Sequence, residues 1–478
     1  MIDNIFSNNL IDETKSGNIL LTLSEHFSQF VSVKRERIDY KHLKIFQHDY
    51  RNFHTEQFRD DVSIQNWNTN LNNANDLFID FHAKLKGCVD RHAPIRQLTP
   101  KEVKLTNKHW ITPEIAKMIK IRNILFARKK RQQNNETIRR HYNLFRNRVS
   151  RELKKSKKKY YSEYFEENKM NIKKIWSGIR EIVNLRNSKP HKLTQLKVGG
   201  RTIINPKDVS NKLNEFFVNV GPITENSIPK SQNISALKFM KQRNQHEFLI
   251  AHVSHEEILD IINSLANKSS GPVSIPIKLL KLIPDLILLP LCNIINVSFN
   301  TGVFPNALKL VKVIPIHKGG STQEMNNYRP ISLLSIFDKI IEKLMHKRLY
   351  KFLEYNNILY QKQFGFRKNN STINALIEIT EKIKESIDKG KFGCGIFIDL
   401  RKAFDTVNHN ILLMKMEHYG IRESALLWFK SYLNKRKQFV YVNGENSELN
   451  ELTCGVPQGS VLGPLLFLNY ILRLTKYI

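Results

Sequence analysis

The sequence from about residue 236 onward alternates closely between helix-like segments, glycine- and proline-containing turns and apolar, strand-like segments. One of these, KFGCGIFID (391–399), is apolar, contains two glycines and ends in the carboxylate of Asp399, which is typical of a buried strand. The sequence therefore predicts an α+β fold for residues 245–478. We expect 391–400 to be a strand of its sheet and 461–472 (VLGPLLFLNYIL) to be a helix packed against that strand.

The chain is strongly basic, with 76 Lys and Arg against 44 Asp and Glu and a net charge of +32. Residues 117–159 hold 17 of the cations and two acids. Thr112 and Pro113 predict the start of a helix at this point. Such a charge excess favours a polyanionic partner, nucleic acid first and a membrane surface second. The alternative is a solvated helical hairpin whose aromatic side chains pack inward.

Several classes of protein are disfavoured by the rest of the composition. The four cysteines lie far apart without the spacing of a zinc knuckle, and they give no support for a disulfide framework. The amino terminus lacks the basic and apolar regions of a signal peptide. The most apolar stretch, 277–299, is interrupted by lysines and prolines, so it predicts a buried helix rather than a membrane span. We expect an intracellular protein.

Six short motifs follow one another in the second half of the chain. In order they are KSSGPVSIP (268–276), a Gly-Pro turn; LKLVKVIPIHKGG (308–320), a basic strand; NYRPISLL (327–334), a basic turn leading to a helix; QFGFR (363–367), a turn; FIDLRKAFDTVNH (397–409), the acidic strand end; and GVPQGSVLGPLLF (455–467), a glycine-rich loop entering a helix. Each motif alone is common, whereas this order is not.

This order resembles the reverse transcriptase of non-LTR, LINE-type retrotransposons, and within them the Jockey-like elements of animals. The resemblance covers about residues 245–468, with core motifs in 298–468. It implies the fingers and an incomplete palm of a right-hand polymerase that copies element RNA into DNA. The implied partners are the RNA template, a DNA primer or target and deoxynucleoside triphosphates, with Mg²⁺ as cofactor and no membrane. The implied locations are a cytoplasmic ribonucleoprotein and the nucleus.

The resemblance also assigns roles to individual residues. Asp399 matches the first metal-binding, catalytic aspartate, and Phe404 matches the bulky residue that excludes a 2′-hydroxyl, with a simple core residue as the alternative for Phe404. Asp405 is expected to be structural. The other matches are Lys312, Lys318 and Arg329 for triphosphate or template, Gln363, Gly365 and Arg367 for the template, and Gln458 and Gly459 for the nascent base pair. Lys312 also fits an ordinary edge-strand lysine.

The amino terminus carries a second resemblance. IDNIFSNN and LSEHFSQF are similar to the last strands of the endonuclease/exonuclease/phosphatase fold, with Asp3, Glu25 and His26 at its active-site positions. We therefore divide the chain into an endonuclease-like remnant (1–34), a linker (35–106), a mainly helical basic region (107–244) and the reverse transcriptase fingers and partial palm (245–478).

The carboxylates that should accompany Asp399 are missing from this sequence. In the family they form an adjacent aspartate pair beyond the glycine-rich loop, whereas Asp405 is the last aspartate here. We therefore expect a piece of such a polymerase, cut at both ends and inactive alone. A non-catalytic nucleic-acid-binding remnant is the alternative, and the endonuclease-like start argues against a third option, a viral RNA-dependent polymerase.

Overall fold

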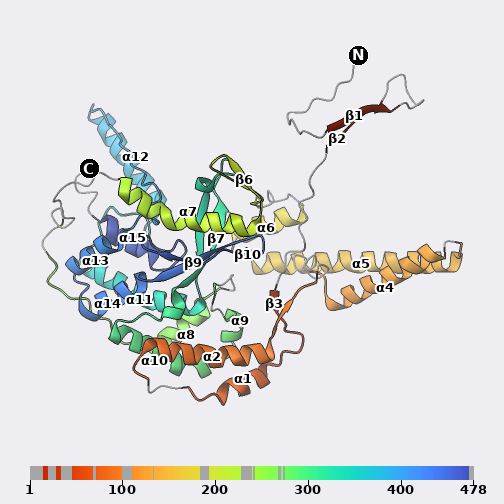
Figure 1. Ribbon diagram of the computed structural model, residues 1–478, viewed down its shortest axis with the longest axis horizontal. Helices are drawn as coiled ribbons and strands as arrows, with labels where there is room; N and C mark the ends of the chain where they lie inside the picture. The colour runs from red at the N-terminus through yellow and green to blue at the C-terminus, as the bar shows by residue number, and fades with distance from the viewer. Residues whose placement is uncertain are drawn as a thin grey trace. The chain divides into compact units, whose positions relative to one another are not determined.

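The computed structural model describes residues 14–19, 28–33, 46–67, 71–99, 110–132, 134–183, 193–227, 240, 243–266, 271–272 and 275–472 (Figure 1). The chain forms two compact units, 1–44 and 45–478. In the first, β1 (Thr14–Ile19) pairs antiparallel with β2 (Ser28–Val33). The candidate endonuclease residues Asp3, Glu25 and His26 lie outside the described residues.

The region predicted as a linker is instead part of the main core. It contains α1 (Thr55–Ser63) and α2 (Ala74–His92), with β3 (Phe46–His48) paired to β4 (Ile95–Gln97). Phe78 and Phe81 of α2 contact Phe337 with ring centroids 5.7 and 5.5 Å apart. The linker prediction is wrong here because the apolar stripe of α2 packs against residues such as Phe337, more than 250 positions later in the chain.

The basic region is mainly helical, as the sequence predicts. Its helices are α4 (Pro113–Arg131), α5 (Glu136–Glu167), α6 (Ile172–Ile182) and α7 (Pro206–Ser227), with a hairpin of β5 (Leu196–Val198) and β6 (Arg201–Ile203) before α7. Thr112 caps α4 as predicted, because its side chain accepts a hydrogen bond from the amide of Ile115. Helices α4 and α5 lie side by side as a hairpin (Figure 1), and α7 packs on β9.

A helical core follows. It consists of α8 (His255–Ser264), α9 (Ile277–Leu280), α10 (Pro284–Thr301), α11 (Ile336–Tyr355), α13 (His409–His418), α14 (Glu423–Leu433) and α15 (Gly463–Ile471). The interrupted apolar stretch 277–299 forms α9 and α10, so the buried-helix prediction is confirmed. None of the helices in the described part of the chain is long and apolar enough to cross a membrane.

The main sheet has the strand order β10-β9-β7-β8, with β11 also paired to β9. Its strands are β7 (Leu310–His317), β8 (Tyr328–Leu333), β9 (Arg436–Val442), β10 (Glu445–Asn446) and β11 (Asn450–Leu452). Strand β7 runs antiparallel to β8 and parallel to β9. The fold is thus a mixture of helix and sheet. NYRPISLL, predicted as a turn, is mostly strand β8, because its backbone pairs with β7.

The predicted strand at 391–400 is absent from the described structure. After α12 (Thr372–Asp388), residues 391–400 have no regular secondary structure and are exposed throughout. Phe397 is 88 % exposed and Ile398 62 % exposed. A strand needs a neighbour for its amide and carbonyl groups, and none of the described strands pairs with this segment. The helix predicted at 461–472 is present as α15, which packs against α13 rather than against a strand.

Candidate functional site

Three separate parts of the chain line one open cleft of about 460 Å³. They are the turn between β7 and β8 with the start of β8, the segment 399–405, and the glycine-rich loop at Gln458. The cleft brings together five of the sequence-predicted site residues: Lys318, Arg329, Asp399, Phe404 and Gln458. It is therefore the candidate functional site.

Two cations stand on one wall of the cleft. Strand β8 alternates, burying Tyr328 and Pro330, so that Arg329 projects from the opposite face and is exposed. Lys318 directly follows β7, where its backbone amide donates a hydrogen bond of 2.9 Å to the carbonyl of Asn327. Neither side chain forms an ion pair with another described residue. Both positive charges are therefore available to an anionic ligand such as a phosphate.

Asp399 supplies a carboxylate at the same cleft. Its side chain is exposed, and it makes no hydrogen bond or ion pair within the part of the chain that the structure describes. Arg401 and Lys402 follow it on the cleft wall. Burial lowers the pKa of Lys402, whose ammonium lies 4.9 Å from the ring centre of Phe216. Asp399 thus faces a predominantly positive surface.

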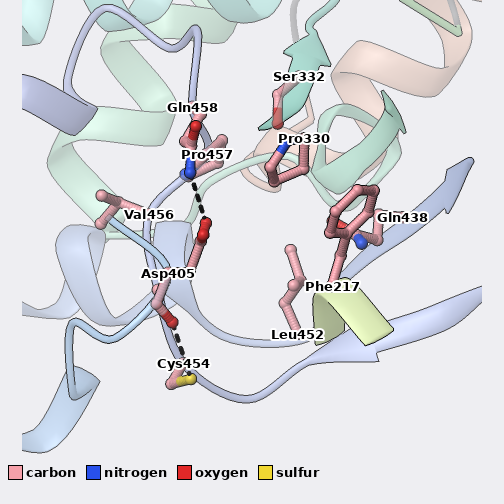
Figure 2. Close-up of a pocket in the computed structure, with 11 residues that line it drawn as sticks. Phe217, Pro330, Ser332, Asp405, Gln438, Leu452, Cys454, Val456, Pro457 and Gln458 are labelled. Carbon is pink, nitrogen blue, oxygen red and sulfur yellow. Dashed lines mark hydrogen bonds between the residues drawn. The ribbon is translucent and has the colours of Figure 1, made fainter. Parts of the chain in front are cut away.

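Asp405 has a different role. Figure 2 shows its carboxylate turned toward Gln458, whose side-chain amide Nε2 donates a hydrogen bond of 2.7 Å to Oδ1. Burial raises the pKa of the Asp405 carboxyl, and the Gln458 hydrogen bond and the charge of Lys402 oppose that rise. The Cys454 thiol donates to the Asp405 backbone carbonyl at 3.3 Å. These contacts agree with the structural role expected for Asp405.

The glycine-rich loop is held against the cleft by its backbone. The amide of Ser332 donates to the carbonyl of Gln458 at 2.7 Å, and the amide of Val456 donates to the carbonyl of Phe404 at 2.8 Å. Gly459 has φ of +119°, and a Cβ there would lie 2.7 Å from the Ser332 carbonyl oxygen. Only glycine allows this approach without strain, which explains Gly459 beside Gln458.

Phe404 lies between the core and the cleft. Its ring stacks on Phe467 of α15 with centroids 5.0 Å apart, and it meets the edge of Phe366 at 6.0 Å. The side chain is half-buried and also lines the cleft. A flat ring fixed by α15 can act as a rigid wall against whatever occupies the cleft.

Five predicted site residues lie outside the cleft lining: Gly459, next to Gln458 in the loop, and Lys312, Gln363, Gly365 and Arg367. Lys312 is partly buried on β7, with its ammonium 3.9 Å from the ring centre of Tyr441, and burial lowers its pKa. Arg367 forms an ion pair of 2.9 Å with Glu354 and donates to the Tyr360 carbonyl at 2.7 Å. The side-chain amide Nε2 of Gln363 donates a hydrogen bond of 3.1 Å to the Gly365 carbonyl. Lys312 and Arg367 thus have partners within the fold.

A buried polar cluster behind the loop was not predicted from the sequence. Glu342 of α11 accepts a hydrogen bond of 2.6 Å from the amide of Val461 and a short one from the Tyr432 hydroxyl. Nearby, Arg436 contacts Asp338 at 3.4 Å. Burial raises the pKa of both carboxyls. The sequence did contain one sign of this cluster: Asp338 and Glu342 are four residues apart, on the same face of α11 as its apolar residues.

The cleft does not form a complete magnesium site from the described residues. Two-metal phosphoryl transfer needs several carboxylate oxygens around one position. The described part of the chain contains no group of three or more His, Cys, Asp or Glu side chains that could hold a metal ion. Asp399 offers one free carboxylate, and that of Asp405 is bonded to Gln458. The described residues thus fit one ligand position only.

Comparison with known proteins bears directly on this cleft. The family reverse transcriptase (RNA-dependent DNA polymerase) matches residues 316–478, which include every cleft residue. This segment belongs to the reverse transcriptase family. A polymerase palm and fingers fold follows for the segment, and the family generally uses a divalent metal ion.

Similar proteins come from mobile elements. The chain is similar to the probable RNA-directed DNA polymerase from transposon BS of Drosophila melanogaster, with 37 % identity over 220 residues, 44 % of this chain and 24 % of that protein. For the polymerase from the mobile element jockey of the same species, identity is 33 % over 244 residues, 51 % of this chain and 26 % of that protein. The chain spans about a quarter of the length of these relatives. The resemblance to Jockey-like LINE elements is confirmed.

Proposed function

We propose that this chain supplies the fingers and part of the palm of an RNA-directed DNA polymerase that copies the RNA of a non-LTR retrotransposon into DNA. The observation that carries the proposal is the cleft itself, where residues up to 140 positions apart, Lys318 and Gln458 among them, meet around Asp399. The template would be element RNA and the primer target DNA. Such an enzyme would work in a cytoplasmic ribonucleoprotein and in the nucleus.

Lys318 and Arg329 would hold the triphosphate of the incoming nucleotide. Both are exposed at the cleft and neither forms an ion pair within the described structure. Charge-assisted hydrogen bonds from a guanidinium or an ammonium are the contacts that phosphate oxygens favour. The rigid ring of Phe404, held by Phe467, would lie against the sugar and exclude a 2′-hydroxyl.

In the reaction, the primer 3′-hydroxyl attacks the α-phosphorus of the triphosphate, forming a phosphodiester bond and releasing pyrophosphate. A divalent ion, bound with Asp399 as one of its ligands, would stabilise the charge that develops on the attacking and leaving oxygens. The residues of the cleft contribute binding and orientation. Gln458 and the Ser332 amide fix the loop that closes the cleft on one side.

A second candidate function is nucleic-acid binding without chemistry. It is favoured by one observation, that Asp399 is the single carboxylate at the cleft that is free of partners among the described residues. The two candidates share the cleft but differ in whether the chain takes part in catalysis. Restoration of activity in a longer protein, described in the Discussion, separates them.

The nucleotide site is tested by the binding of a fluorescent deoxynucleoside triphosphate to the purified chain in the presence of Mg²⁺. Lys318→Gln and Arg329→Gln are each expected to weaken binding about three- to tenfold, because each removes a charged hydrogen-bond donor from the cleft. Lys312→Gln is the matched control, since Lys312 lies on Tyr441 outside the cleft lining. Equal losses in all three variants would contradict the proposed site.

A further inference from the structure

The hairpin of α4 and α5 carries a charge excess that the reverse transcriptase segment does not explain. It lies wholly outside residues 316–478. Of the 17 Lys and Arg side chains in 117–159, 14 are exposed and three, Arg122, Lys129 and Lys157, are half-buried. Within the described residues, only Lys159 among them forms an ion pair with an acid, Glu163 at 3.8 Å. This surface, 117–159, is called the basic hairpin below.

Four of the cations of α5 lie along one side of the helix. Arg140, Arg151, Lys155 and Lys158 are separated by 11, 4 and 3 residues, which places them in one row. Val149, nine residues from Arg140, points the opposite way and is buried. The row extends for about 27 Å at ~1.5 Å per residue. One strand of duplex DNA presents about eight phosphates over that length.

Aromatic side chains in the basic hairpin and directly beside it pack against one another. Tyr161 is 5 % exposed, and its ring lies 5.7 Å from that of Trp110. Phe126 and Tyr142 contact each other across α4 and α5 at 5.6 Å. Lys129 and Lys157 lie over these rings. Of these four rings, Tyr161 is buried and only Phe126, which is 52 % exposed, belongs to the exposed class, so their packing leaves little ring surface to stack on unpaired bases, as single-strand binding requires.

We propose that the basic hairpin is a second nucleic-acid contact, separate from the cleft, that binds the phosphate backbone of a duplex without reading its bases. The row of cations on α5 supplies the electrostatic attraction, and the packed aromatic side keeps the row straight. The inference rests on charge and geometry and stands whether or not the cleft is a polymerase site. A negative result for duplex binding by the basic hairpin would therefore leave the proposed polymerase site untouched, and the reverse also holds.

The test is fluorescence anisotropy with a labelled 24-base-pair duplex of arbitrary sequence, titrated with the full chain between 50 and 300 mM salt. The row variant replaces Arg140, Arg151, Lys155 and Lys158 with Gln. We expect at least tenfold weaker binding at 100 mM salt. The slope of log K, the binding constant, against log salt concentration should be smaller in magnitude by up to about 3.6, because each lost phosphate contact removes ~0.9. Changing the base sequence should leave the affinity unchanged.

The matched control replaces four exposed lysines on α11, α12, α14 and β9 with Gln: Lys351, Lys384, Lys430 and Lys437. It removes the same charge and is expected to change affinity less than threefold. The variant Arg140→Lys/Arg151→Lys keeps the charge and should bind as the parent does. Circular dichroism checks the folding of each variant.

Three results would overturn the proposal. Equal losses in the row variant and the control would mean that net charge alone drives binding. Tighter binding of single-stranded than of duplex probe would mean that bases are contacted. Preferential binding of phosphatidylserine vesicles at the same salt would assign the basic hairpin to a membrane surface.

Discussion

The side-chain amide of Gln458 donates a hydrogen bond of 2.7 Å to the carboxylate of Asp405, while the backbone carbonyl of Gln458 accepts one from Ser332. One residue thus ties the glycine-rich loop to two other walls of the cleft, strand β8 and the segment after Asp399. The cleft is therefore a joint product of distant parts of the chain, and its shape depends on this residue.

Replacing Gln458 with Leu is expected to destabilise the fold by about 1.5–3 kcal/mol, because the partly buried carboxylate of Asp405 loses a hydrogen-bond donor. The measurement is urea unfolding at pH 7. In the Asp405→Asn background the same substitution should cost less, since the group left without a donor is then neutral. An identical cost in both backgrounds would show that the hydrogen bond is not the cause.

Asp405→Asn alone is expected to be neutral or stabilising at pH 7. The folded state raises the carboxyl pKa above its ordinary value of 3.8, so the folded protein binds the proton more tightly. The protonated Asp405 carboxyl therefore stabilises the fold below pH 3.8, and this contribution to the free energy of unfolding is lost as the pH rises through the folded pKa. An asparagine does not ionise, so the Asp405→Asn variant does not lose stability over that pH range. A marked destabilisation at pH 7 would contradict the burial-driven shift.

Phe81→Ala should destabilise the chain by about 3–5 kcal/mol, because it leaves a cavity beside Phe337 in the main core. Ile79→Ala in the same helix is the control, since Ile79 is 57 % exposed, and it should cost much less. Chemical unfolding of the two variants provides the comparison. Similar small effects for both would restore the interpretation of this region as a linker.

Glu257 makes stability sensitive to acid. Burial alone would raise its pKa, but hydrogen bonds from Lys347 and Arg348 lower it to about 2. The stabilisation is present above pH 4.5 and is lost as the pH falls toward 2. Glu257→Gln is expected to cost about 1–2 kcal/mol at pH 7, allowing for solvent screening. The difference in unfolding free energy between the parent chain and Glu257→Gln should become smaller below pH 4.5. A difference that stays constant with pH would contradict the lowered pKa of Glu257.

Structural features that depend on neighbouring residues were predicted correctly from the sequence. The cap at Thr112, the apolar helices in 277–299, strand β7 and helix α15 all depend on residues close in the chain. The order of motifs also identified the reverse transcriptase family, which the comparison with known proteins confirmed. Turn glycines such as Gly459 mark close backbone approaches that the structure shows.

Features that depend on distant partners were not predictable in the same way. Segment 391–400 has the composition of a buried strand, but composition does not supply a neighbour for its backbone. The two polar partners of Arg367, Glu354 and Tyr360, could not be read from its motif. The apolar residues on one face of α2 did not indicate that Phe337 would pack against them.

The 478-residue chain alone is predicted not to extend a DNA primer on an RNA template, even where it binds the duplex. Asp399 is one ligand, Asp405 is bonded to Gln458, and no aspartate follows Asp405 in the sequence. Stabilisation of the attacking and leaving oxygens is worth several kcal/mol, and each ~1.4 kcal/mol is tenfold in rate. A gel-based extension assay with Mg²⁺ decides this, and clear extension would mean that another acid reaches the metal.

The most direct measurement is primer extension by a fusion of this chain to the palm hairpin and thumb of an intact relative whose sequence contains the adjacent aspartate pair. The fusion should extend the primer, and Asp399→Asn in it should reduce the rate by at least a hundredfold, because the metal loses a carboxylate ligand. Asp388→Asn, an exposed acid at the end of α12, is the control and should retain the rate. Full activity in the Asp399→Asn fusion would contradict the assignment of this cleft as the polymerase site.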